Sequence, residues 1–451
     1  MNPVNLIKYL LVGLSIVWYI ILYHFIERSE FLFFISGILI LGLSYFYWIA
    51  KNSFGPKEVI VLAILFRALF LVGMPNLSDD YFRFFWDGKL TVEGVNPYEF
   101  TPQQYKENGL DSQSQEVYPF LNSQEYFSVY PPVNQFFFKS AAFLAKGNLQ
   151  GTVFFLKLFI FLFDIAFIFL LMQFLRKLLL PAALAQIYAL NPLVIIELTG
   201  NLHFEGVMLF FLFSGIFYLW KNRLVFASLA IGLSVGVKII PLLLLPLFLP
   251  FIGIKKSIKL SFGIFFFVFL FSWPFVSSKV ILNFSESLNL YFQTFEFNSS
   301  VYYLAKQISI EFLGYKSPSV GVFLPFFTLL VILALTGYLW VKKPLLRESR
   351  IDISLFMKFS AMAMALYYLM SSTVHPWYVI NILVFSVFSF SRAFVAWSIL
   401  VFLSYFVYSE YVLDFAPHQD FNSYWLYYIF IFIQYAIVLF IFIFDLSKKH
   451  K

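Results

Sequence analysis

The sequence predicts an all-α, polytopic membrane protein. Hydrophobic residues occupy 61% of the 451 positions and charged residues only 12%, about half the charged fraction of an ordinary soluble domain. Apolar runs long enough to cross about 30 Å of hydrocarbon recur along the chain, and in such runs a helix satisfies every backbone hydrogen bond internally. We therefore expect one membrane domain over residues 1–451 and no separate globular domain.

Hydropathy and run length predict about fourteen membrane spans. The first, from Leu6 to about Tyr23, has no small-residue cleavage site, so we expect a retained helix and not a signal peptide. Pro241 and Pro246 can break a helix, which favours two spans between residues 224 and 254. The spans begin near residues 6, 31, 58, 152, 178, 205, 224, 241, 257, 320, 353, 376, 393 and 424.

Lys and Arg residues gather in short clusters between these spans. With a cytoplasmic amino terminus the clusters fall on the cytoplasmic side at nearly every turn, as the positive-inside rule requires. We expect an inner-membrane protein with both termini in the cytoplasm, and the net charge of +7 then gives no reason to expect nucleic acid as a partner. The clusters are Lys51 and Lys57, Arg176 and Lys177, Lys221 and Arg223, Lys255, Lys256 and Lys259, Lys342 to Arg350, Arg392, and Lys448, Lys449 and Lys451.

The same threading leaves most unusual polar residues on the extracytoplasmic side. Two large loops lie there, 76–131 and 276–318, and the first is expected to be the catalytic loop. The segments Val133–Lys146 and Val301–Leu313 fit short helices lying in the membrane interface. The other extracytoplasmic segments are Asn201–Glu205, the vicinity of Lys238, His375–Tyr378 and Tyr408–Asn422.

Asp79 and Asp80 are the strongest candidates for catalysis. They follow an apolar segment, so they would be held at a membrane surface, where desolvation raises the basicity of a carboxylate. Such a carboxylate can accept the proton of an attacking hydroxyl. The alternative is helix capping by Ser78 or Asp79, but capping accounts for only one of the two acids. The sequence does not distinguish which acid is the base.

Three residues of the same segment could support this pair. Arg83 follows both acids by three or four residues and can pair with them on one helical face, where its salt bridge would fix the loop. Trp86 is either an interfacial anchor or an aromatic face for a sugar or prenyl chain. Asp87 either supports the loop or contacts the ligand.

Charged residues inside apolar segments form a second group. His203 and Glu205 follow Glu197 at a helix-to-helix turn, and ionisable groups in a membrane need a partner. Two ligands are too few for a metal site, so a divalent metal is possible but not favoured and no cofactor is required. Lys238, ahead of Pro241, costs roughly 2.5 to 3.5 kcal/mol on insertion unless it snorkels or meets an anion such as a lipid phosphate.

The segment His375-Pro376-Trp377-Tyr378 adds an imidazole and two aromatic rings. His375 can donate to a phosphate or a sugar hydroxyl while Trp377 and Tyr378 stack, although a Trp-Tyr pair at a helix end is also ordinary interfacial composition. The chain has no cysteine, which excludes thiolate chemistry and Cys-ligated metals.

In chain order these motifs resemble the GT-C superfamily of polytopic glycosyltransferases, and within it the polyprenyl-phosphate-mannose-dependent mannosyltransferases. The resemblance covers most of the chain, and its specificity comes from the succession of motifs because each one alone is weak. The motifs are Asp79-Asp80 with Arg83, Trp86-Asp87-Gly88, Gly94-Val95-Asn96-Pro97-Tyr98, Tyr130-Pro131-Pro132, Asn191-Pro192, His203-Phe204-Glu205-Gly206, Lys238-Ile239-Ile240-Pro241 and His375-Pro376-Trp377-Tyr378.

The resemblance implies a GT-C-like bundle and an inverting transfer of a hexose, with mannose favoured. The donor would be a polyprenyl-phosphate sugar and the acceptor a hydroxyl of a lipid or glycan, with membrane lipids as the surroundings. The residues that it assigns are Asp79 or Asp80 as general base, Lys238, His375 and Arg83 for the donor phosphate, and Trp86, Asp87, His203, Glu205, Trp377 and Tyr378 for the substrates.

Two departures and one rival function qualify this assignment. Many members of the superfamily have Asp-x-Asp or Glu-x-Asp, whereas the acids here are adjacent. The chain also lacks the large soluble carboxy-terminal domain of the oligosaccharyltransferase-like branch, so we do not expect protein glycosylation of that kind. A transporter or flippase is the alternative, but the sequence shows neither an internal repeat nor polar residues clustered in mid-bundle.

Overall fold

In the computed structural model the regular secondary structure of the described residues is helical, apart from one isolated β-bridge, which confirms the all-α prediction. Parts of the expected segments 276–318 and Tyr408–Asn422, most of the Lys342–Arg350 cluster and the lysines after Lys448 lie outside the described residues. The described residues are 3–107, 109, 111–283, 285, 287, 295–317, 319–342, 352–389, 391–410 and 425–448.

Seven described helices are long and apolar enough to cross a membrane, so the chain is a multi-pass membrane protein. One further candidate is the pair Ala182–Ala189 and Pro192–Gly200, whose two halves are bent by 58°. The seven are α1 (Pro3–His24), α2 (Phe31–Lys51), α8 (Leu149–Lys177), α14 (Ile254–Ser272), α17 (Ser319–Lys342), α18 (Ile353–Met370) and α22 (Trp425–Lys448).

The expected number of about fourteen spans is not confirmed. Several expected spans are helices shorter than the roughly 20 residues that cross a bilayer. Hydropathy does not separate the two cases, because a helix buried in a bundle is as apolar as a span. The short helices are α3 (Pro56–Ala68), α11 (Glu205–Trp220), α12 (Leu224–Val237), α13 (Leu249–Ile252), α19 (Val379–Ser389) and α20 (Arg392–Leu400).

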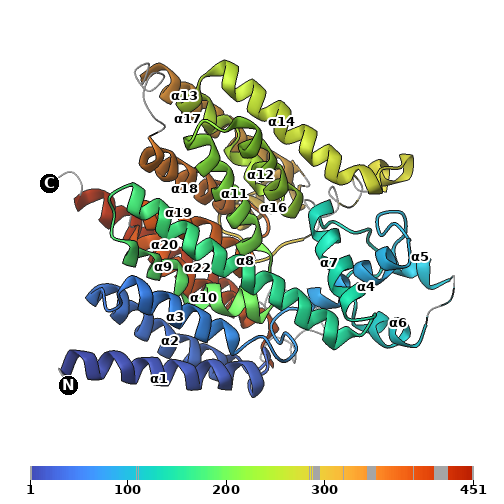
Figure 1. Ribbon diagram of the computed structural model, residues 1–451, viewed down its shortest axis with the longest axis horizontal. Coiled ribbons are helices and arrows are strands. Elements are labelled where there is room, and N and C mark those ends of the chain that lie inside the picture. Colours follow the sequence, from blue (N-terminus) through green and yellow to red (C-terminus); the bar gives the residue numbers. More distant parts are fainter. Residues whose placement is uncertain are drawn as a thin grey trace.

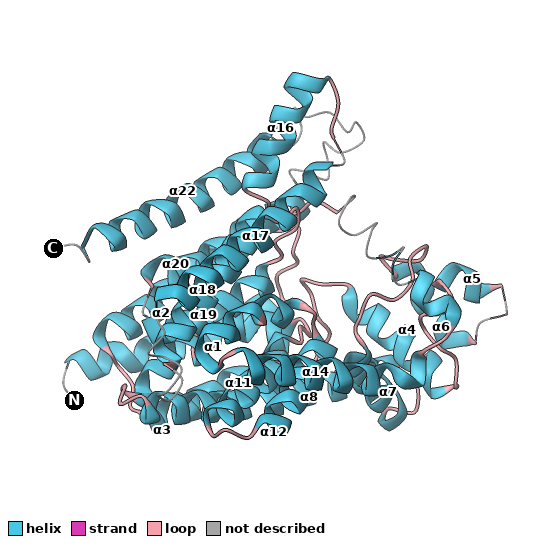
Figure 2. Cartoon of the chain, turned by 90° about the horizontal axis from the view of Figure 1, so that it is seen from above, coloured by secondary structure: helices cyan, strands magenta, loops and turns pink. Residues whose placement is uncertain are grey.

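The first large loop folds into a compact group of helices at the end of the bundle away from both termini (Figures 1 and 2). Close packing of α4 on α7 explains why Gly88 follows Trp86 and Asp87, since a Cβ at Gly88 would lie 2.5 Å from the Phe138 carbonyl oxygen. The helices are α4 (Asp80–Val92), α5 (Pro102–Lys106), α6 (Ser112–Val117) and α7 (Pro132–Leu144). The two expected interfacial segments are helical, as α7 and as α16 (Val301–Leu313).

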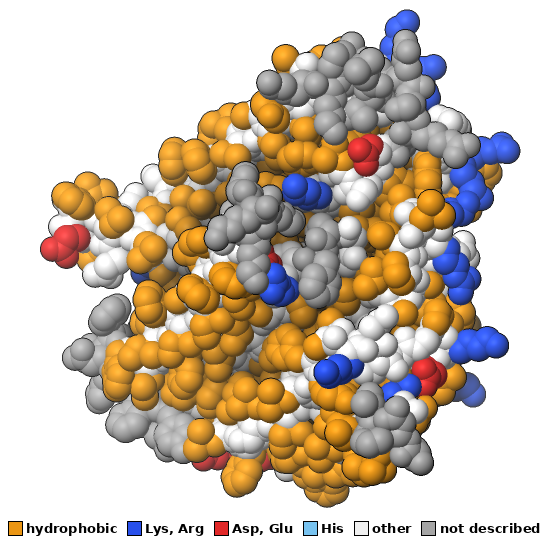
Figure 3. Space-filling view, turned by 90° about the vertical axis from the view of Figure 1, so that its left-hand side faces the viewer, with side chains coloured by type: hydrophobic (Ala, Val, Ile, Leu, Met, Phe, Trp, Pro, Cys, Tyr) orange, Lys and Arg blue, Asp and Glu red, His pale blue; other side chains and the backbone are white. Residues whose placement is uncertain are grey.

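Figure 3 looks onto the opposite end, where apolar side chains cover much of the surface and Lys and Arg lie between them. Large apolar side chains are exposed along the long helices, including Leu43 (69%), Phe262 (75%) and Phe440 (70%). An apolar surface of this extent is unfavourable in water and favourable against lipid.

Arg67 and Asp164 are charged groups buried among the helices, and they pair with each other. Arg67 donates from Nε to Asp164 at 2.5 Å and from Nη1 to the Ala189 carbonyl at 2.7 Å, and Tyr188 donates to the other Asp164 oxygen at 2.5 Å. All these side chains are buried. A charge inside a bundle is costly unless it finds such partners. This cluster ties α3 and α8 to the bent segment that leads into the candidate site.

Candidate active site

The acidic pair lies where α4 begins. Asp79 occupies the capping position, but its carboxylate makes no capping bond, and instead the Asp80 amide lies 3.3 Å from the Ser78 hydroxyl. Asp79 forms an ion pair with Arg28 at 2.7 Å, and both side chains are partly exposed. Capping therefore explains the position of Ser78 and neither of the two acids.

Asp80 has different surroundings from its neighbour. It is half-buried, and Asn122 donates to its Oδ1 at 3.2 Å. Desolvation raises the pKa of its carboxyl above the ordinary value, while Asn122 and the nearby Lys238 ammonium lower it by less. Asp80 thus faces the Asn122 amide, the Tyr130 hydroxyl and the Lys238 ammonium, whereas Asp79 is paired directly with a guanidinium.

Arg28 is a site residue that the sequence analysis missed. Its guanidinium pairs with Asp79 and also lies 4.9 Å from the centre of the Tyr408 ring. The available signal was its position, because Arg28 falls between the first two spans, on the side that the positive-inside pattern leaves poor in cations.

Lys238 follows the last residue of α12 in extended backbone, which turns its side chain toward the start of α11. Its ammonium pairs with the buried carboxylate of Glu205 and lies 5.5 Å from the centre of the Tyr378 ring. The same ammonium is near enough to lower the pKa of Asp80, His203 and His375. Lys238 is therefore the group around which the acid of α4 and the two histidines come together.

The two histidines belong to a column of four aromatic rings. His203 stacks on Trp377 with centres 3.5 Å apart, Trp377 on His375 at 4.4 Å, and His375 on Phe297 at 4.9 Å. The planes of Trp377 and His375 differ by only 6°. Trp377 thus stacks on two imidazoles, and the expectation that it contacts substrate stays a prediction. Tyr378 lies edge-on to His375 at 5.4 Å.

Burial decides the protonation of these histidines. It lowers the pKa of His375 to about 3, helped by the Lys238 ammonium, and it lowers the pKa of His203 well below the ordinary value, helped by Lys238 and then His375. Both imidazoles are therefore neutral near pH 7. Each can donate one hydrogen bond and accept another.

Arg83, Trp86 and Asp87 lie away from the acidic pair, inside the loop helices. Arg83 pairs with Asp87 at 2.8 Å and not with Asp79 or Asp80, because its side chain lies on the inner face of α4. It also donates to the carbonyls of residues 123 and 126. Trp86 is buried in the small core of these helices.

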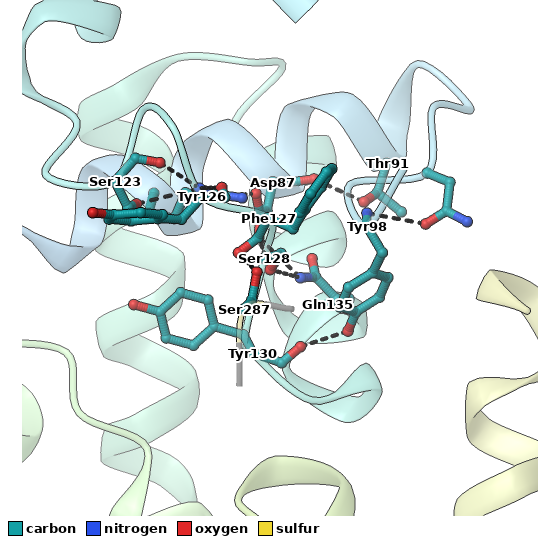
Figure 4. Close-up of polar contacts among 12 residues, drawn as sticks. Asp87, Thr91, Tyr98, Ser123, Tyr126, Phe127, Ser128, Tyr130, Gln135 and Ser287 are labelled. Carbon is teal, nitrogen blue, oxygen red and sulfur yellow. Dashed lines mark hydrogen bonds and ion pairs between the residues drawn. The ribbon is translucent and has the colours of Figure 1, made fainter. Parts of the chain in front are cut away.

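Asp87 completes this internal network (Figure 4). It is fully buried and accepts hydrogen bonds from Arg83, from Ser128 at 2.5 Å and from Gln135 at 3.0 Å. With these partners it joins α4, α7 and the chain between them. The observed arrangement holds the loop together.

An apolar groove of about 1170 Å³ opens between α16, α17, α18, α20 and α22. Its lining includes Ser299 and Ser300. Those residues lie two and three positions after Phe297, whose backbone bonds to Ser372 and Val374 beside His375. One wall of the groove is therefore continuous with the ring column.

A metal site is not evident in the part of the chain that the structure describes, because no three His, Cys, Asp or Glu side chains there lie close enough to hold an ion. The expectation that the protein requires no metal stays a prediction. The polar groups that meet near Lys238 can accept a proton, donate hydrogen bonds and neutralise an anion.

A scan against protein-family models matches this chain to a known family. The model of the MptA_B family, described as alpha-(1->6)-mannopyranosyltransferase, N-terminal domain, matches residues 14–253, which is more than half of the chain. The matched segment includes Asp79, Asp80, Glu205 and Lys238 and ends before His375. Neither a curated protein nor a solved structure matches.

Proposed function

The chain belongs to the MptA_B family of alpha-(1->6)-mannopyranosyltransferases, and from that premise we propose that it moves mannose from a polyprenyl phosphate to a hydroxyl of a lipid or glycan acceptor. The transfer inverts the anomeric carbon and takes place at the extracytoplasmic face of the inner membrane, with both termini in the cytoplasm. The transporter or flippase alternative is set aside because the family consists of enzymes.

Asp80 is the general base of this proposal. The contrast between the two acids carries the assignment, because Asp79 is paired with the Arg28 guanidinium whereas Asp80 accepts from the amide of Asn122. Burial also raises the pKa of Asp80, which makes its ionised carboxylate a stronger base. In the reaction the acceptor oxygen bonds to the anomeric carbon and its proton passes to Asp80. The bond from that carbon to the donor phosphate breaks, and the electron pair stays on the phosphate.

Lys238 and His375 receive the negative charge that develops on the leaving phosphate. Only one of the three ammonium donors of Lys238 is needed for Glu205, and His375 offers a neutral N–H. Donors fixed in a water-poor site stabilise developing charge more than donors in water. The predicted phosphate role of Arg83 is not carried forward, because its guanidinium is held by Asp87 and the chain at 123–126.

The apolar groove supports a lipid-linked donor over a water-soluble one. Its lining is almost entirely apolar, and its Ser299–Ser300 wall adjoins the segment that stacks on His375. A polyprenyl chain lying in the groove would place its phosphate at the ring column, near Lys238. A nucleotide sugar has no long apolar chain to occupy such a groove.

The proposal is tested with purified protein in lipid nanodiscs, radiolabelled donors and a membrane lipid extract as acceptor. We expect label to move from polyprenyl-phosphate mannose, and not from polyprenyl-phosphate glucose or from a nucleotide-linked mannose. Asp80→Asn should slow the transfer about a thousandfold and Asp79→Asn should slow it much less. Transfer from the nucleotide sugar alone, or full activity of Asp80→Asn, would overturn the donor or the base, respectively.

A further inference from the structure

A buried carboxylate that the proposed mechanism does not use lies next to the ring column. Glu197 belongs to a π-helical turn, Ile195–Gly200, which follows α10 (Pro192–Val194) in the bent segment. Its side chain is fully buried. A π-helical turn is rare and is frequently found at functional sites.

Each oxygen of Glu197 points at a different part of the chain. Oε1 accepts a hydrogen bond from the Tyr405 hydroxyl at 2.8 Å, and Oε2 lies 3.4 Å from Nε2 of His203. Neither that oxygen nor that nitrogen has a hydrogen-bond partner among the described residues. The backbone repeats the connection, since the His203 amide donates to the Glu197 carbonyl at 3.2 Å. His203 is thus tied to Glu197 through both main chain and side chain.

The position of His203 determines what lies beyond it. Its ring rests on Trp377 at 3.5 Å, and Trp377 lies almost parallel to His375. Rings in such close contact cannot tilt separately, so a rotation of His203 would displace Trp377 and then His375. The column therefore connects Glu197 mechanically to the imidazole that faces the proposed donor phosphate.

We propose that Glu197 is a positioning residue of the mannosyl transfer, which fixes the ring of His203 and, through Trp377, the ring of His375. The inference rests on the proposed function, because the value of a fixed His375 depends on a donor phosphate binding there. In this role Glu197 acts through His203 and not by contact with substrate. One proton shared between Oε2 and Nε2 satisfies both atoms, and Tyr405 holds the carboxylate in place for it.

Glu197→Gln tests this role because it keeps the size of the side chain and an oxygen to accept from Tyr405. It replaces the other oxygen by an amide that donates two protons and changes the contact with His203. We expect kcat to fall about tenfold to hundredfold, as for other residues that orient a site group. KM for the acceptor and the thermal midpoint should stay close to those of the wild type.

A double-mutant cycle with His203→Ala separates positioning from a general structural effect. If Glu197 acts through His203, the double variant should be no slower than His203→Ala alone. Asp164→Asn is the matched control, since Asp164 is also a buried carboxylate bonded to a tyrosine, and it should lower the thermal midpoint without entering this cycle.

Failure of the inference can be told apart from failure of the proposed function. If the wild type uses another mannosyl donor, the donor assignment is wrong, and the same cycle is measured with the donor that it does use. The inference is overturned if Glu197→Gln has wild-type kcat, or if its effect multiplies with that of His203→Ala. It is also overturned if the thermal midpoint of Glu197→Gln falls as far as that of Asp164→Asn, because the role of Glu197 would then be structural, and this measurement needs no donor.

Discussion

Helix α4 carries carboxylates in two contrasting environments. At its start Asp79 and Asp80 are partly exposed, and Asp80 accepts from an amide. Two turns later Asp87 is fully buried, and three side chains donate to its two oxygens, one of them the guanidinium of Arg83. A carboxylate held by three donors, one of them a guanidinium, cannot accept a proton without losing those bonds, whereas Asp80 forms no ion pair with a described residue. The beginning of the helix therefore suits chemistry, and its inner face holds the loop together.

The largest effect is expected for Asp80→Asn, measured as a fall in kcat. Replacing the base with Asn removes the proton acceptor, so kcat should fall about a thousandfold, within the range for general bases. The measurement is the initial rate of mannosyl transfer per folded molecule. Asp79→Asn is the control, with a smaller loss because Asp79 is already paired with Arg28. A larger loss for Asp79→Asn would exchange the roles of the two acids.

Replacing Asp87 should affect the stability of the fold more than its activity. Asp87→Asn leaves the Arg83 guanidinium without its charged partner in a buried place and sets an amide against three donors, which should lower the free energy of unfolding by about 3 kcal/mol. The measurement is unfolding in mixed micelles. Thr91→Val, which removes only a hydroxyl that donates to the Asp87 carbonyl, should cost about 1 kcal/mol. An inactive Asp87→Asn protein of normal stability would place Asp87 in the chemistry after all.

The same contrast shows what the sequence could predict. Seven spans were predictable because runs near 20 apolar residues have few alternatives to a membrane helix, as for α8 and α22. The shorter helices α11 and α12 are equally apolar, and their length depends on packing that hydropathy does not record. The acids of α4 stood out against apolar surroundings. The sequence did not show which way the Arg83 side chain points, because helical spacing alone places it near the acids at the start of the helix and near Asp87 equally well.

Other site features depend on contacts between distant parts of the chain. Lys238, His203 and His375 could be singled out because a polar side chain in an apolar segment is costly and needs a reason. Arg28 meets a partner 51 residues away, and Glu197 bonds to Tyr405, which lies 208 residues further along the chain. No local pattern encodes such pairs.

The pH dependence of activity tests whether Asp80 is the base, because the nearby Lys238 affects the pKa of that carboxyl. Activity requires ionised Asp80, so it should fall as the pH drops through the raised pKa of that carboxyl, and the Lys238 ammonium lowers that pKa. Lys238→Gln should therefore move the acidic limb of kcat/KM to higher pH, besides reducing kcat about tenfold to hundredfold through loss of the phosphate ligand. Lys89→Gln, which removes a lysine paired with Asp111, is the control. A limb that stays in place would mean that Asp80 is not the titrating group.

The contribution of Asp80 to the stability of the fold should decrease as the pH rises, whereas its contribution to activity should increase. Because the folded state raises the pKa of Asp80, the protonated form is favoured by folding, and its stabilising contribution is lost as the pH rises through that pKa. Asn mimics the protonated form. Asp80→Asn should consequently have a higher thermal midpoint than the wild type at neutral pH and an equal one in acid, whereas Asp87→Asn should be less stable at neutral pH.

The smallest effect is expected at Arg28. The Arg28–Asp79 pair is about one-third exposed on each side, so solvent screens it, and Arg28→Gln should cost only about 0.2 to 1 kcal/mol of stability. Activity should fall less than tenfold, since an unpaired Asp79 carboxylate beside Asp80 disfavours a second negative charge and raises the pKa of the base. The acidic limb should then move to higher pH, and Arg28→Lys should restore it because a cation returns. If Arg28→Gln instead abolished transfer without moving the limb, Arg28 would belong with Lys238 among the ligands of the phosphate.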